Sequence, residues 1–156
     1  MKKQQSGFTM IELIMVIVIL GILAAFALPR FADFGKDARV ASINGALGAV
    51  KSAAAIAHAK QLADGTASGT AVTLEGATIN MVNGYPQATV DTAGATTGGI
   101  MAAAQLSTEF EGNGGGTAAE VLTIRLKNKT SCLFTYQVPA TAGTAPVFGT
   151  IDPDGC

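Results

Sequence analysis

A single carboxylate stands inside a long apolar run near the start of this chain. Residues 8–28 read FTMIELIMVIVILGILAAFAL, and Glu12 is the one charged residue among them. A carboxylate in a membrane-length segment is costly unless a partner neutralises it, so it is a candidate functional residue. The chemistry that suits Glu12 is an ion pair with a cation on another copy of the chain. Snorkelling of the carboxylate to the lipid headgroups is the alternative.

Two cysteines form a second pair that could do chemistry. Cys132 and Cys156 are the two cysteines of the 156-residue chain. In an exported chain an even number of cysteines favours one disulfide, which would stabilise the fold by roughly 3 kcal/mol. Two free thiols or a metal pair are the alternatives. With one histidine and no Cys-x-x-Cys, a zinc site is disfavoured.

The other polar residues do not form a catalytic pattern. His58 is the one histidine and has no Cys, Asp or Glu at metal-ligand spacing, so we expect it on a helix surface or in packing. Asp152 and Asp154 flank a proline and supply too few oxygens for a calcium loop, so they predict a turn. No nucleophile stands beside a base. The sequence therefore predicts a protein that is not an enzyme and has no metal and no cofactor.

The charge balance disfavours nucleic acid as a partner. Ten basic residues stand against eleven acidic ones, for a formal net charge of −1. A nucleic-acid-binding protein needs a basic face, and the cluster of Arg125, Lys127 and Lys129 supplies three charges. We therefore expect no nucleic-acid partner.

A basic leader precedes the apolar run. Residues 1–7 read MKKQQSG, and the 21 residues that follow would span about 31 Å as a helix, enough for a bilayer core. The two lysines favour a cytoplasmic N-terminus, which leaves the rest of the chain outside. A secretory signal peptide is the competing interpretation, but cleavage near residues 24–27 would discard Glu12.

The residues around the leader resemble those of a known family. SGFTMIEL is similar to the type IV prepilin signature: a short basic leader that ends in Gly, then Phe-Thr-x-x-Glu, then a hydrophobic stretch. Gly7, Phe8 and Glu12 stand at the matching positions, and the C-terminal cysteine pair also looks like that of type IV pilins. GYP at 84–86 and DARV at 37–40 resemble the mannose-sensitive haemagglutinin subgroup.

The resemblance implies a role for each of these residues. Prepilin peptidase would cut between Gly7 and Phe8 and would N-methylate Phe8. Glu12 would pair with the Phe8 amine of a neighbouring subunit during assembly. Gly21 and Pro29 would mark a bend or melted stretch in an assembled pilus, with a continuous helix in an isolated subunit. The disulfide Cys132–Cys156 would tie the C-terminal tail to a strand.

These residues require a long helix and a small sheet to position them. Beyond Pro29, apolar residues recur at spacings of three and four, which predicts an amphipathic helix that ends near Asp64 with Gly65 as its cap. The stripe consists of Val40, Ile43, Leu47, Val50, Ala54 and Ala57. We expect strands over 71–75, 77–82, 121–127, 132–138 and 146–151, and a short helix within 99–106. Residues 83–97 predict a connection, and 112–116 predict a flexible loop.

The sequence thus predicts an α+β fold in which a long N-terminal α-helix packs on a small antiparallel β-sheet, like the lollipop of type IV pilins. It divides into a cleaved leader (1–7), a transmembrane and polymerisation helix (8–28), an amphipathic continuation (29–64) and a globular head with a disulfide loop (65–156).

The resemblance also implies a function. The chain would be a structural subunit of a type IV pilus, a homopolymer built by the pilus assembly machinery for attachment to an unknown surface receptor. Its precursor would sit in the inner membrane with a cytoplasmic leader and a periplasmic head, and the assembled filament would be extracellular. A pseudopilin of a type II secretion system and a pilin for DNA uptake are the alternatives.

Overall fold

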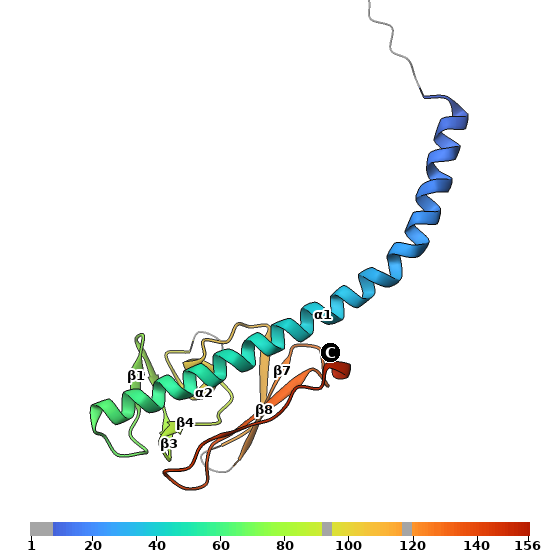
Figure 1. Cartoon of the computed structure of the whole chain (residues 1–156). Helices are drawn as coiled ribbons and strands as arrows, with labels where there is room; N and C mark the ends of the chain where they lie inside the picture. Colours follow the sequence, from blue (N-terminus) through green and yellow to red (C-terminus); the bar gives the residue numbers. More distant parts are fainter. Residues whose placement is uncertain (1–7, 92–94, 117–119) are drawn as a thin grey trace, which may run out of the picture. The chain divides into compact units, whose positions relative to one another are not determined.

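The computed structural model describes residues 8–91, 95–116 and 120–156, and it opens with one long helix (Figure 1). This helix, α1, runs over Met10–Asp64 without interruption. The chain forms two compact units, Met1–Ala38 and Arg39–Cys156, and α1 contributes to both. The helix passes Gly21 and Pro29 without a break, as expected for an isolated subunit. The leader and Gly7 lie outside the described residues.

The end of α1 is set by a glycine and by a buried glutamine. Gly65 adopts a left-handed backbone with φ of 64°, which confirms the predicted cap. Gln61 is buried in the last turn, and its side-chain amide donates to the carbonyls of Ala67 and Thr70, both at 3.0 Å. These two bonds fold the chain back immediately after the helix.

Within the described residues, nine strands and two short helices follow, and the strands form three sheets. The first sheet has the order β1 (Val72–Leu74), β2 (Ala77–Ile79) and β5 (Thr97–Gly98); the second pairs β3 (Met81–Val82) with β4 (Tyr85–Pro86). The third is antiparallel, in the order β6 (Phe110–Gly114), β7 (Val121–Leu126), β8 (Leu133–Gln137) and β9 (Val147–Phe148). The helices are α2 (Ile100–Ala103) and a 3₁₀ turn at Pro153–Gly155.

The predicted α+β architecture is confirmed, with four local corrections. Residues 112–116 were expected to be a flexible loop, but Phe110–Gly114 is a strand, because its backbone pairs with β7. Gly112 fits this position because a Cβ there would lie 2.8 Å from Met101 Sδ.

The expected connection 83–97 contains β4 and the first residue of β5, and the expected single strand 77–82 is divided into β2 and β3. The strands are also not all antiparallel, since β2 and β5 run parallel.

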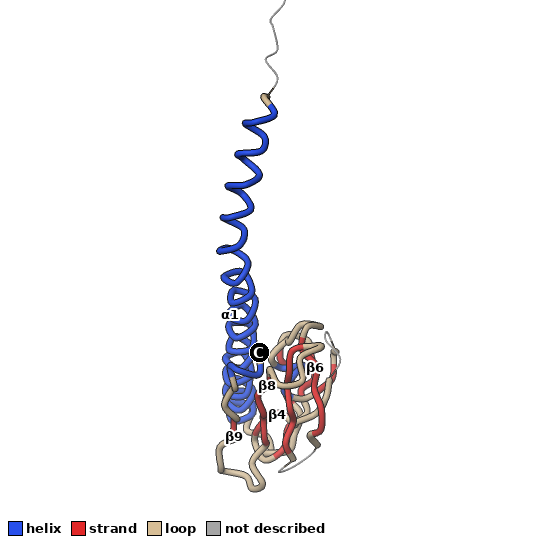
Figure 2. Tube along the Cα trace, turned by 90° about the vertical axis from the view of Figure 1, so that its right-hand side faces the viewer, coloured by secondary structure: helices blue, strands red, loops and turns tan. Residues whose placement is uncertain are grey.

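The Arg39–Cys156 unit, called the head from here on, includes the C-terminal part of α1, and its core lies between that part and the four-stranded sheet. On the helix, Ile43 and Val50 are fully buried, as the apolar stripe predicts. On the sheet, buried residues alternate with half-buried or exposed ones along β7 and β8, because successive side chains of a strand point to opposite faces. The buried strand residues that pair across the ladder are Leu122 with Tyr136 and Ile124 with Phe134. Figure 2 shows the strands beside this part of α1.

Candidate functional site

The first turn of α1 is closed by a reciprocal pair of side chains. The backbone N–H and the hydroxyl of Thr9 both donate to Glu12 Oε2, at 2.8 and 2.7 Å. In return, the Glu12 backbone N–H donates to Thr9 Oγ1 at 3.3 Å. This is a capping box, in which a Thr at the N-cap and a Glu three residues later satisfy the free N–H groups of the helix start. The carboxylate of Glu12 is therefore held at the beginning of α1.

The helix that follows Glu12 leaves its apolar side chains uncovered. From Met10 to Phe26 each large apolar side chain exposes between 47% and 79% of its surface, and Phe8 exposes 90%. By length and composition, Met10–Ala27 could cross a membrane, and none of that window is buried. Phe34–Asp64 passes the same test but is one-third buried. Such an uncovered apolar surface is far larger than water tolerates on a monomer, so lipid or other molecules must cover Met10–Ala27.

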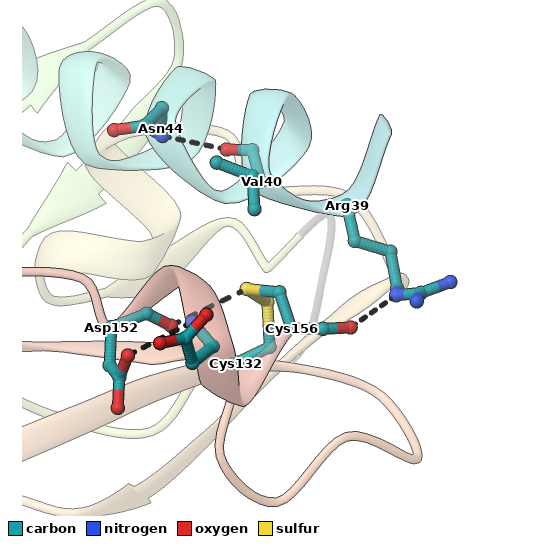
Figure 3. The surroundings of a disulfide bond; sticks show 7 residues. Arg39, Val40, Asn44, Cys132, Asp152 and Cys156 are labelled. Carbon is teal, nitrogen blue, oxygen red and sulfur yellow. Dashed lines mark hydrogen bonds between the residues drawn. A yellow bond between two sulfur atoms is a disulfide. The ribbon is translucent and has the colours of Figure 1, made fainter. Parts of the chain in front are cut away.

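The second predicted site lies in the head and is a disulfide bond. Cys132 and Cys156 form a disulfide across 24 positions of sequence, with their Cα atoms 4.3 Å apart. Figure 3 shows this bond, and both cysteines are buried. Cys132 immediately precedes β8, so the bond ties the tail to the central hairpin, as predicted.

Three contacts position the tail for this link. Asp152 caps the 3₁₀ turn by accepting from the Asp154 N–H at 2.9 Å. Arg39 Nε donates to the main-chain oxygen of Cys156 at 2.6 Å, which anchors the tail to α1 (Figure 3). Gly155 leaves room for the approach, since a Cβ there would lie 2.2 Å from the carbonyl oxygen of Ser131. The tail is thus fixed by hydrogen bonds and by the disulfide together.

Comparison with known proteins gives a match to one family model and several relatives. Residues 2–28 match the family model of the prokaryotic N-terminal methylation motif. The chain is 35% identical to the fimbrial protein EcpC of Eikenella corrodens over 108 residues, which cover 63% of this chain and 71% of that protein. It is 35% identical to a type IV major alpha-pilin of Moraxella bovis over 120 residues, or 76% of this chain and 69% of that protein.

The chain belongs to the type IV pilins. A further relative, the type IV narrow pilus major component PilA5 of Thermus thermophilus, is 54% identical over 52 residues, which cover 33% of this chain and 45% of that protein. No solved structure gives a significant match. The names of these relatives favour a pilus subunit over a secretion pseudopilin or a DNA-uptake pilin. The haemagglutinin subgroup remains a prediction.

Within this pilin, the predicted site residues separate into two groups. Phe8 and Glu12 lie together at the start of α1, and Gly21 lies within it. The cysteines lie in the head. Within residues 8–91, 95–116 and 120–156, no group of three or more His, Cys, Asp or Glu residues gathers as metal ligands would.

The sequence analysis did not identify two of the positioning residues. Thr9 was noted as part of the family signature, but Thr9-x-x-Glu12 also spells a capping box, which could have revealed the local bond. Arg39 carries no comparable signal, because its contact with Cys156 bridges 117 positions of sequence.

His58 was expected on a helix surface or in packing, and the structure places it in packing. Its ring stacks on Tyr85, with the centroids 4.4 Å apart and the planes 7° from parallel. Nδ1 lies 2.7 Å from the carbonyl oxygen of Gly84, so in this arrangement Nδ1 carries the proton and donates. Gly84 has φ of 94°, and a Cβ there would lie 3.2 Å from the histidine ring. The histidine therefore fastens the β3–β4 turn to α1.

Proposed function

We propose that this pilin polymerises through the N-terminal half of α1 into a surface filament that serves in attachment. The observation that carries the proposal is an uncovered apolar helix, Met10–Ala27, with one carboxylate held at its start. Helices of neighbouring copies would cover this surface in a bundle, in the way that lipid covers it before assembly.

The leader controls when the partner of Glu12 exists. While residues 1–7 are attached, the nitrogen of Phe8 is an amide and carries no charge. Cleavage between Gly7 and Phe8 by prepilin peptidase converts it to an amine, and N-methylation keeps that amine positively charged. The match of residues 2–28 to the N-terminal methylation motif supports this processing. Cleavage thus creates the cation with which Glu12 of a neighbouring subunit can pair during assembly.

The geometry of the helix start suits an intersubunit pair. Both hydrogen bonds from Thr9 end on Oε2 of Glu12. An ionised carboxylate accepts about four hydrogen bonds, so Oε1 can receive the Phe8 amine of a neighbour while the cap stays closed. Opposite charges attract strongly where helices exclude water, so the pair favours the filament over the separated subunits.

The proposal also assigns a location to the protein before and after assembly. The precursor sits in the inner membrane with its leader in the cytoplasm and its head in the periplasm. The pilus assembly machinery then moves mature subunits into an extracellular homopolymer, whose surface receptor is a separate partner. The names of the relatives, a narrow pilus major component, a fimbrial protein and a major alpha-pilin, support this route.

Two measurements test the proposal. The full chain is expressed with a prepilin peptidase and pilus machinery, and the mature protein is sequenced from its N-terminus. We expect it to begin at N-methylated Phe8. The variant Glu12→Gln keeps the shape of the side chain and removes its charge, so we expect normal cleavage and a loss of filaments.

The matched control is Glu120→Gln, which makes the same change at an exposed position of the head. We expect it to assemble like the parent. A mature protein that begins elsewhere, or abundant filaments from Glu12→Gln, would contradict the proposed function.

A further inference from the structure

The head carries a groove with one acidic residue on its edge. A cavity of about 650 Å³ opens between α1, the β1–β2 turn and the segment that follows α2. Ile56 of α1 and Leu74 of β1 supply apolar walls, and Ile56 is 58% exposed. Glu75 is the one charged residue in its lining. The groove therefore offers apolar surface and a negative edge.

Glu75 is held in place at this edge. It occupies the β1–β2 turn with φ of 48°, a backbone conformation that residues other than glycine seldom adopt. Gln105 Nε2 donates to Glu75 Oε2 at 3.0 Å across the groove. The ion pairs described for the head join Lys60 to Asp64 and Arg125 to Glu111, and neither includes Glu75. Its charge is thus available to a cation from outside.

A second hollow of the head has the opposite charge. A cavity of about 420 Å³ is lined by three cationic residues, Arg39, Lys127 and Lys129, and one acid, Glu109. Arg39 is engaged by the Cys156 oxygen. Lys127 and Lys129 are exposed on the turn between β7 and β8, where the Lys129 N–H donates to the Leu126 carbonyl at 3.0 Å. This turn presents two lysines on a hydrogen-bonded backbone.

The two hollows occupy successive positions along the head. Arg39 and Ile56 are about 17 residues apart on α1, or roughly 26 Å at ~1.5 Å per residue. Thr108 lines both cavities, so they lie on the same side of the unit. In Figure 1, β1 lies beside the C-terminal part of α1, and the chain's C-terminus lies at the other end of the head. Complementary patches at different places on one subunit produce head-to-tail contacts, which build open filaments where the rotation between copies does not close a ring.

We propose that a second copy of this chain occupies the groove, with the Lys127 and Lys129 turn of one head placed against Glu75 of the next. The inference rests on the proposed function, because it assigns the contact between heads in the filament. Lysine suits this groove because its aliphatic stem can cover Ile56 and Leu74 while its ammonium reaches the carboxylate. The contact supplements the helix bundle and sets the axial offset between heads.

Cross-linking tests the contact in filaments of the unaltered chain. Filaments are grown from a mixture of ¹⁵N-labelled and unlabelled subunits and treated with a carbodiimide, which joins carboxylates to amines in direct contact. We expect mixed-isotope peptides that join Glu75 to Lys127 or Lys129. Cross-links of Glu75 to another lysine alone, or none at Glu75 while other carboxylates react, would overturn the proposal.

Charge reversal provides a second test. We expect Glu75→Lys, and separately Lys127→Glu with Lys129→Glu, to lower filament yield roughly tenfold, because like charges then face each other. Combining all three changes should restore the yield. The control Glu120→Lys makes the same change outside both linings and should assemble normally.

The outcomes separate the two proposals. Subunit level and cleavage are measured for every variant, so that loss of folding is recognised. If the parent chain forms filaments and the combined variant does not recover, the head contact is wrong and the pilus function stands. If the processed parent forms no filament at all, the pilus function itself fails.

Discussion

The two parts of α1 differ in what covers their apolar side chains. Along Met10–Ala27, large apolar residues are about half exposed or more. Along the part that belongs to the head, Ile43, Val50 and Ala57 are fully buried. The helix is continuous through both parts, so the difference does not come from secondary structure. The apolar side chains of the head part are covered by the rest of the same chain, and those of Met10–Ala27 need other molecules to cover them.

This difference assigns separate roles to substitutions. Buried apolar surface stabilises a fold by about 25 cal/mol per Å² removed from water. Side chains of the head contribute this energy when a single chain folds. Side chains of Met10–Ala27 contribute it when lipid or other subunits surround them. Changes in the head should therefore alter unfolding, and changes near the N-terminus should alter assembly.

The largest expected effect separates the two parts directly. Phe134→Ala removes a fully buried ring and should lower the free energy of unfolding of the head by about 3–5 kcal/mol. Ile17→Ala changes a side chain that is 57% exposed and should alter it by less than about 0.5 kcal/mol. Denaturant unfolding of the full chain in detergent measures both. Equal losses of stability from the two substitutions would contradict the claim that only the head side chains stabilise the single folded chain.

Loss of the disulfide should come next. The double variant Cys132→Ser with Cys156→Ser should lower the stability of the head by roughly 3 kcal/mol, because the unfolded chain gains freedom. Chemical reduction of the parent chain is the matched control and should give a similar loss. Unchanged unfolding after either treatment would show that Arg39 and the 3₁₀ turn suffice to hold the tail.

The main helix and the position of Glu12 in its first turn could be predicted from the sequence because their signals are local. The apolar run with Glu12 is one short segment, and the stripe through Ile43 and Val50 repeats from one helical turn to the next. The hairpin of β7 and β8 followed from alternation at period two. These patterns depend on neighbours in sequence, which a single chain displays.

The missed features depend on residues distant in sequence. Phe110–Gly114 looks like a loop by composition, and pairing with β7 makes it a strand. β5 has no apolar run and is defined by its parallel pairing with β2. Arg39 gains its role from a tail 117 positions away. In each case a contact between residues far apart in sequence determines the structure, and local propensity does not indicate it.

A smaller effect tests the polar part of the head core. Tyr136 is fully buried, and its hydroxyl donates to the Pro86 carbonyl at 2.8 Å. Tyr136→Phe should therefore cost about 1 kcal/mol of stability at neutral pH, with the ring contacts retained. Thermal unfolding measures this loss. An increase in stability would show that the hydrogen bond opposes folding.

Burial also gives Tyr136 a pH dependence. Burial, aided by Tyr85, raises the pKa of Tyr136 above its ordinary value, so the folded chain keeps a proton that the unfolded chain loses above pH ~10. Stability from this residue is complete below that pH and is lost as pH rises toward the folded pKa. Tyr136→Phe should reduce this alkaline loss, and an unchanged profile would contradict the assignment.

The smallest expected effect concerns the helix start. Thr9→Val removes the hydroxyl of the capping box, and amide exchange in the first turn of α1 should speed up about fivefold, as for loss of an N-cap. Thr9→Ser retains a hydroxyl and should exchange like the parent. Unfolding of the head should not change in either variant. Slower exchange in Thr9→Val would show that the cap does not stabilise the helix.

The most direct test of the account measures the partner of Glu12 in assembled filaments. Subunits labelled with ¹³C at the Glu12 carboxylate are mixed with subunits labelled with ¹⁵N at Phe8, and solid-state NMR detects transfer between the two labels. Transfer between differently labelled copies, at the roughly 4 Å separation of an ion pair, is the result we predict. Filaments that form without any such transfer would contradict the claim that another subunit completes the N-terminal part of α1 at Glu12.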